Sequence, residues 1–148
     1  MEQTHNYDEP NKGKWALARM IIGILSLVLF PLISLQSCAA GASNMMSNSG
    51  EISGSAGFIT AVCFFVGGLV GLLTRNSQKK GGPITSCVFY WFAFFLSRMF
   101  SGSFSDLRIW GVMACIFGIV FLLAAMKTKK EIIIASIISA IYFIIDMA

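Results

Sequence analysis

The sequence predicts an all-α fold, a bundle of membrane-spanning helices with four spans and a fifth apolar helix at its C-terminus. Of its 148 residues, 56% are hydrophobic and only 12% are charged, whereas soluble domains average about 25% charged residues. The apolar residues form runs of about 20, the length that crosses a bilayer as a helix. Short Lys and Arg clusters separate these runs, as is typical of membrane proteins.

The chain divides into a polar N-terminal tail, residues 1–14, a four-helix transmembrane domain, residues 15–130, and a C-terminal apolar helix, residues 131–148. The tail has no apolar face, so we expect no fold there. The four spans are predicted over residues 15–37, 55–74, 83–100 and 107–126. Each must be helical, because a lone strand would leave its backbone polar groups unpaired in lipid. Pro31 is expected to kink the first span.

The C-terminal helix is short for a span, because its uncharged part covers only residues 132–145. A fifth span is favoured, with Glu131 and Asp146 at opposite membrane surfaces. The alternative is a helix that lies in the interface or enters the membrane halfway. A surface amphipathic helix is the weaker choice, because Ser136 and Ser139 make no charged face.

Basic residues lie before the first span and after the second and fourth, while residues 38–54 contain none. Because cytoplasmic loops carry the excess of Lys and Arg, we predict a multi-pass protein of the cell membrane with a cytoplasmic N-terminus. Arg98 and Arg108 are expected to reach the outer headgroups by snorkelling. The residues that set this topology are Lys12, Lys14, Arg19, Arg75, Lys79, Lys80, Lys127, Lys129 and Lys130.

Two of the predicted helices carry a face of small residues. Such residues let helix backbones approach closely in lipid, so these faces are predicted to pack against other helices. Packing within one chain is the favoured interpretation, and a homo-oligomer or a contact with another membrane subunit is the alternative. The predicted packing residues are Gly67, Gly68, Gly71, Gly111, Ala114, Cys115 and Gly118.

Cys38 raises the question of lipoprotein processing, because Ser37 and Cys38 follow an apolar run with basic residues before it. That run is about twenty residues long, whereas a leader has an apolar stretch of about 7–15. A lipid anchor would also add little to a chain held by several spans. We therefore expect Cys38 to be an unprocessed residue at a helix end, with lipidation as the less favoured alternative.

The chemistry that the sequence lacks excludes several classes of function. No ionisable residue lies near the middle of a confident span, which disfavours an ion-coupled transporter. The single histidine, His5, lies in the tail, and the four cysteines have no CxxC spacing. There is no phosphate-binding loop or catalytic triad. We expect no enzymatic activity, cofactor, metal or nucleic-acid partner, and the lipid bilayer is the expected environment.

Residues 38–57 are rich in Gly, Ser and Asn, with Met45 and Met46 as the only large apolar residues in the middle of the stretch. This composition predicts a flexible outer loop.

A faint internal repeat also exists, since a shift of 52 residues places residues 49–53 on 101–105 and Cys63 on Cys115. The match stops before the first and third helices. Chance is therefore favoured over a duplicated hairpin.

Four segments together carry a resemblance: SLQSCAAG (34–41), SGSAGF (53–58), GLVGLLTRNS (68–77) and GSFSDLRIW (102–110). They resemble a group of small multi-spanning membrane proteins from Gram-positive bacteria with a QSCAAG, GSAGF and SDLxIW pattern. The resemblance covers residues 15–130 and implies an unprocessed first helix, but no activity.

The leading functional prediction is a non-enzymatic accessory or interaction subunit that packs through its small-residue helix faces against itself or another membrane subunit. The main alternative is a small channel or transporter that works as an oligomer. A weaker alternative is a membrane sensor or immunity protein that binds a ligand through the 38–57 loop.

Overall fold

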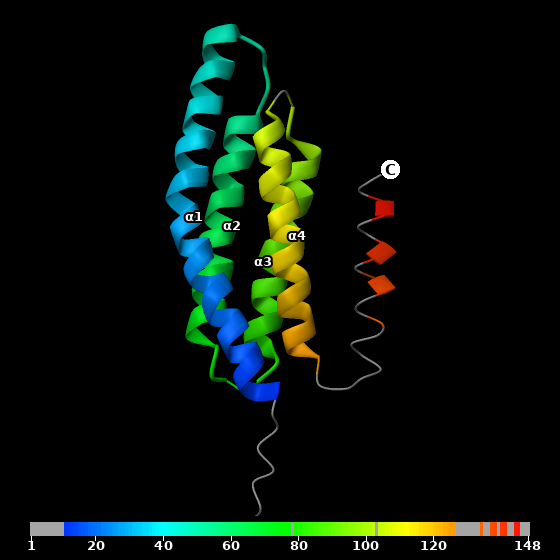
Figure 1. The fold of residues 1–148 in the computed structure, drawn as a ribbon. Helices are drawn as coiled ribbons and strands as arrows, with labels where there is room; N and C mark the ends of the chain where they lie inside the picture. The colour runs from blue at the N-terminus through cyan, green and yellow to red at the C-terminus, as the bar shows by residue number, and fades with distance from the viewer. Residues whose placement is uncertain are drawn as a thin grey trace, which may run out of the picture.

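The computed structural model describes residues 11–77, 79–102 and 104–126, together with seven single residues between 134 and 145. Four helices make up the continuous part: α1 (Asn11–Ser47), α2 (Ser53–Leu73), α3 (Gly81–Met99) and α4 (Ser105–Ala125). No strand occurs in these ranges, so the predicted all-α class is confirmed (Figure 1). The ends of α2, α3 and α4 fall within two residues of the predicted spans.

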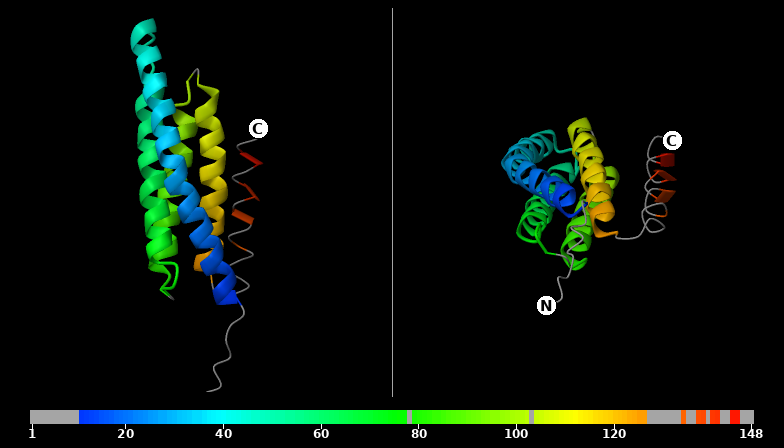
Figure 2. Two further views of the ribbon diagram at one scale, coloured as in Figure 1. Left: turned by 60° about the vertical axis from the view of Figure 1, so that its left-hand side comes forward. Right: turned by 60° about the horizontal axis from the view of Figure 1, so that its bottom comes forward.

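Helices that follow one another in sequence lie side by side and antiparallel (Figure 1). The chain therefore forms two hairpins, α1–α2 and α3–α4, joined through the α2–α3 contact. α1 runs obliquely across the bundle and touches α4 only sparsely (Figure 2). Residues 11 and 125 lie at the same end as the 74–80 turn, which we call the basic end; the opposite end is the far end.

Three helices are long and apolar enough to cross a membrane: α1 from Trp15 to Ser47, α2 and α4. Three of the four predicted spans meet this criterion among the described residues, and α3 does not reach the same apolarity. Its 19 residues include Ser86, Tyr90 and Arg98.

The prediction of a flexible outer loop over residues 38–57 is wrong. α1 continues through Cys38 to Ser47 and α2 begins at Ser53, so the connection is only residues 48–52. Tertiary contacts explain the extension, because the Asn44 amide donates hydrogen bonds to Ser53 Oγ at 2.8 Å and to the Glu51 carbonyl at 3.2 Å. Gly41 and Gly54 let the helices meet there, since a Cβ built on Gly54 would lie 2.5 Å from Gly41 Cα.

The boundaries of the two terminal segments also differ from the prediction. Residues 11–14 belong to α1 and not to the tail, and α1 remains helical through Pro31. Residues 1–10 lie outside the described part. The predicted fifth helix, 131–148, lies mostly outside it too, and the structure does not show that helix. The described residues there are helical and exposed: Ile134, Ile137, Ile138, Ala140, Ile141, Ile144 and Ile145.

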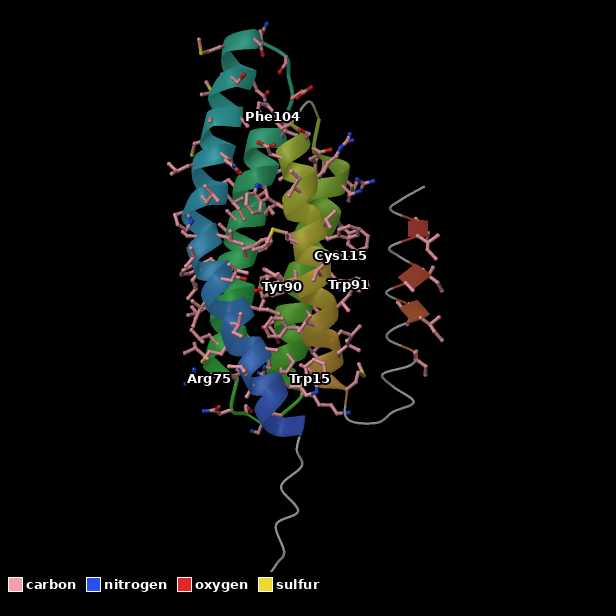
Figure 3. The ribbon with its side chains drawn as sticks, viewed as in Figure 1. Trp15, Arg75, Tyr90, Trp91, Phe104 and Cys115 are labelled. Carbon is pink, nitrogen blue, oxygen red and sulfur yellow. The ribbon has the colours of Figure 1, made fainter. Side chains whose placement is uncertain are left out.

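An aromatic cluster fills the middle of the bundle, with Tyr90 fully buried at its centre (Figure 3). The Tyr90 ring stacks on Phe121 with centroids 5.5 Å apart. Phe64 and Phe117 meet Tyr90 edge-on at 5.6 and 5.5 Å, in the T-shaped geometry that aromatic pairs favour. Rings from α2, α3 and α4 therefore close the interior at this level.

Candidate functional site

The seven predicted packing residues are all buried within the bundle. Gly67 faces Tyr90, Gly71 faces Phe121, and Gly118 faces Trp91. Gly68 lies against α1, where a Cβ would come within 2.7 Å of Ser26 Cβ. These small side chains thus contact other helices of the same chain, and a partner would have to bind elsewhere.

The sequence analysis missed a buried hydrogen bond at the centre of the bundle. Ser26 Oγ and Tyr90 Oη lie 2.6 Å apart, and both side chains are fully buried. A buried hydroxyl without a partner is costly, so each side chain satisfies the other. Tyr90 carries a hydroxyl in the middle of a predicted span, and a hydroxyl buried there needs a partner. That requirement was the available signal.

Arg19, one of the predicted topology residues, turns into the bundle and is only 5% exposed. Its Nη2 donates to the Thr74 carbonyl and, at 2.8 Å, to Thr74 Oγ1, while Nη1 donates to the Arg75 carbonyl at 3.3 Å. A cation at a helix C-terminus satisfies carbonyls that have no partner within the helix. Arg19 of α1 therefore caps the C-terminus of α2.

The other predicted topology residues lie where the chain reaches the basic end. Arg75, Lys79 and Lys80 are exposed there, in the turn that joins α2 to α3. Figure 3 shows Trp15 and Arg75 at that end of the bundle. Lys12 and Lys14 belong to the first turns of α1. Lys127, Lys129 and Lys130 lie outside the described residues.

At the far end, polar side chains join α1 to α4. Trp110 Nε1 donates a hydrogen bond to Gln36 Oε1 at 2.7 Å. Beside this bond is a cavity of about 30 Å³ whose polar lining includes Ser37, Ser53 and Asp106. A space of this size holds one water molecule. The cavity is therefore too small for an organic ligand.

The larger concave feature is a groove on the outside of the α1–α2 hairpin, with a volume of about 360 Å³. Cys38, Ser55, Phe58 and Ile59 are exposed along it. Its floor is the close contact between Gly41 and Gly54. The residues that line this Cys38 groove are Ser37, Cys38, Gly41, Gly54, Ser55, Phe58 and Ile59.

Cys38 itself lies in an unbroken stretch of α1, nine residues before the end of the helix. Cleavage before Cys38 would remove Arg19, Ser26 and Ile33, whose side chains are all buried in the bundle. The expectation of an unprocessed Cys38 stays a prediction.

The described residues contain no group of three or more His, Cys, Asp or Glu side chains able to hold a metal ion. All four cysteines are free thiols; Cys38 is exposed, and Cys63, Cys87 and Cys115 are buried.

In comparisons with known proteins, no family model, no curated sequence and no solved structure matches this chain.

Proposed function

We propose that this chain is a non-enzymatic accessory subunit of the cell membrane, which binds another membrane protein or a second copy of itself through the Cys38 groove. The observation that carries the proposal is a contrast between interior and surface. The predicted small-residue faces are buried between helices of the same chain. The Cys38 groove, in contrast, has small residues and two exposed apolar side chains, Phe58 and Ile59, on the outside of the bundle. In lipid, such small-residue surfaces are where helices associate.

In this proposal all four helices cross the membrane and the basic end faces the cytoplasm. α3 has 19 residues and therefore rises about 28 Å, close to the thickness of the hydrocarbon core of about 30 Å. It also lies between α2 and α4, both of which are apolar enough to span. Arg75, Lys79 and Lys80 at the basic end favour the cytoplasmic side. The resemblance to small membrane proteins of Gram-positive bacteria supports the same location.

The fold limits the two alternative functions. A pore along the axis of one chain would have to pass the level of Tyr90, Phe64, Phe117 and Phe121, where rings fill the interior. The oligomeric channel or transporter stays the main alternative, with its path between copies of the chain. A ligand-binding outer loop would have only residues 48–52 available, because the rest of the expected loop is helical.

Site-directed photocrosslinking at Cys38 tests the proposal. Cys38 is the exposed cysteine, so a maleimide-benzophenone reagent should label it in intact membranes. We expect a crosslink to one defined protein, either a second copy or another membrane protein. Ser55→Trp fills the groove with an indole ring and should reduce that crosslink at least tenfold.

Thr85→Trp is the matched control, because Thr85 is also an exposed hydroxyl residue near the start of a helix but lies away from the groove. It should leave the crosslink unchanged. Crosslinks to lipid alone, or a protein crosslink that survives Ser55→Trp, would refute the proposal.

A further inference from the structure

The two hairpins have the same layout at a constant offset of 52 residues. α1 ends at Ser47 and α3 at Met99, positions 52 apart, and α2 and α4 begin at Ser53 and Ser105 with the same offset. Both second helices have 21 residues. The sequence match at Cys63 and Cys115 therefore continues as a match of helix boundaries.

Unusual backbone and side-chain positions follow the same offset. Gly50 and Gly102, which correspond, both have positive φ, +68° and +48°, in the turns of their hairpins. Positive φ is a conformation that glycine adopts without strain.

The correspondence also reaches into the first helices, where the sequence comparison alone found none. Pro31 falls on Pro83, and Ser34 falls on Ser86. The hydroxyl oxygens of Ser34 and Ser86 are both buried and have no hydrogen-bond partner among the described residues. Duplication of a hairpin explains these matches better than chance does. The matches are the Pro-x-x-Ser segment, the helix boundaries and the turn glycines.

The same offset of 52 residues aligns the C-terminal segment with α3. Residues 133–148 fall on residues 81–96 of α3, with Tyr142 on Tyr90 and Phe143 on Trp91. By this offset, the segment takes the place of a third first helix.

α3, the first helix of the second hairpin, packs against one side of α2. A Cβ on Gly67 would lie 3.3 Å from the Tyr90 ring, and one on Gly71 would lie 3.4 Å from Ser86 Oγ. Gly57, at the far end of this side, lies against Ser37 and Leu107. The residues along this side of α2 are all buried: Gly57, Thr60, Phe64, Gly67 and Gly71.

The corresponding face of α4 is less buried: Val112, Ile119 and Leu123 are half-buried, and Ile119 packs against the core. Two members of this face are large exposed side chains, since Ile109 is 58% and Ile116 is 51% exposed. The face consists of Ile109, Val112, Ile116, Ile119 and Leu123. α3 therefore covers this side of α2, whereas none of the described helices fully covers the corresponding side of α4.

We propose that residues 133–148 dock antiparallel on this face of α4, as α3 docks on α2. Adding 52 to both residue numbers of an α2–α3 contact gives the pair expected between α4 and the C-terminal segment. The Gly67–Tyr90 contact thus predicts a contact between Ile119 and Tyr142. The Gly71–Ser86 contact predicts one between Leu123 and Ile138. Ile138 is 41% exposed and available for such a contact. Because Ile119 and Leu123 replace two glycines, the helix axes lie further apart here than in α2–α3.

A cysteine pair tests the docking in a full-length chain whose four native cysteines are replaced by serine or alanine. Leu123→Cys with Ile138→Cys, treated in membranes with a short bis-maleimide, should give an intrachain bridge. Intact mass identifies it as a monomer with one linker and no free thiol. We expect most of the protein to bridge.

Leu123→Cys with Ala140→Cys is the control, because residue 140 corresponds to Val88, which points outward at 61% exposure. Two residues along a helix turn the side chain through about 200°, so this pair should bridge at least fivefold less. Equal bridging by both pairs would overturn the proposal. Dimers in place of bridged monomers would also overturn it, because they would assign the face to a second copy.

Asp146 gives a second readout of the register. It corresponds to Phe94, which is 6% exposed in the apolar part of α3. An ionised carboxylate at such a depth is costly in lipid, so Asp146→Asn should raise the bridged fraction of the Leu123–Ile138 cysteine pair. An unchanged or lower fraction would overturn this register.

Discussion

The two hairpins share a layout but differ in how their helices meet. In α1–α2, backbone meets backbone: a Cβ on Gly54 would lie 2.5 Å from Gly41, and one on Gly23 would lie 2.9 Å from the Gly68 carbonyl. In α3–α4, rings mediate the contact, with Tyr90 stacked on Phe121 and Gly118 making room for Trp91. The same small residue therefore has two uses, close approach of helices in one hairpin and space for an aromatic ring in the other.

This difference determines what each hairpin tolerates. A main-chain neighbour cannot move without shifting a whole helix, whereas a ring can rotate about its side-chain bonds. Close packing in a protein interior makes either intrusion costly. The α1–α2 hairpin should therefore be the less tolerant of added volume.

Substitution of single glycines should give the largest effect. Gly54→Ala places a methyl group on the Gly41 backbone and should destabilise the protein by about 3 kcal/mol, at the upper end for overpacking. Gly118→Ala meets the Trp91 ring and should cost about 1–2 kcal/mol. Unfolding titrations with SDS in mixed micelles would measure both.

Gly81→Ala is the control, because nothing lies within 4 Å of a Cβ at that position. It should be neutral, or stabilising by less than about 1 kcal/mol through helix propensity. If Gly118→Ala proved more damaging than Gly54→Ala, the distinction between the hairpins would be wrong.

Removal of the Arg19 cap should cause the second-largest loss of stability. Arg19→Ala leaves the carbonyls of Thr74 and Arg75 without their donor and should cost about 2 kcal/mol, as expected for hydrogen bonds to a charged group. Arg19→Lys keeps the charge but cannot reach both carbonyls with the same geometry, so it should recover only part of the loss. The same SDS titration gives the comparison. Full recovery by lysine would mean that charge alone matters at this position.

The Ser26–Tyr90 bond, which ties the two hairpins together, should have the smallest effect. Tyr90→Phe keeps the ring contacts and removes the hydroxyl, at a cost of about 1 kcal/mol. A double-mutant cycle with Ser26→Ala should give a coupling energy of about 0.6 kcal/mol, the average for hydrogen bonds between membrane helices. A coupling of zero would mean that the two hydroxyls do not support each other.

The sequence predicted the helices well where hydropathy was decisive. Apolar runs bounded by Gly, Ser and Lys located α2, α3 and α4 to within two residues. The end of α1 could not be found in this way, because hydropathy reports a preference for lipid and not helicity. Residues 38–47 are helical because Asn44 and Gly41 meet α2, and such contacts exist only in the folded chain.

The candidate site was harder to predict for a related reason. The glycine pattern marked residues that the structure buries, but a pattern on one helix does not show which helix will cover it. Arg19 counted only as one more basic residue that sets the topology, because the sequence does not show that the end of α2 lies within reach of its guanidinium. The Cys38 groove depends on the extended α1, so an error in one helix boundary concealed the surface.

The length of α1 has a consequence for what the protein would present at a membrane surface. Its 37 residues rise about 55 Å, longer than a hydrocarbon core of about 30 Å. The apolar run of about twenty residues before Cys38 matches that core, so residues 38–47 would extend beyond it. α1 is held to α2 by Arg19 at one end and Asn44 at the other, so it cannot change its tilt independently. In a membrane, the hairpin would thus hold these ten residues at a fixed height above the hydrocarbon.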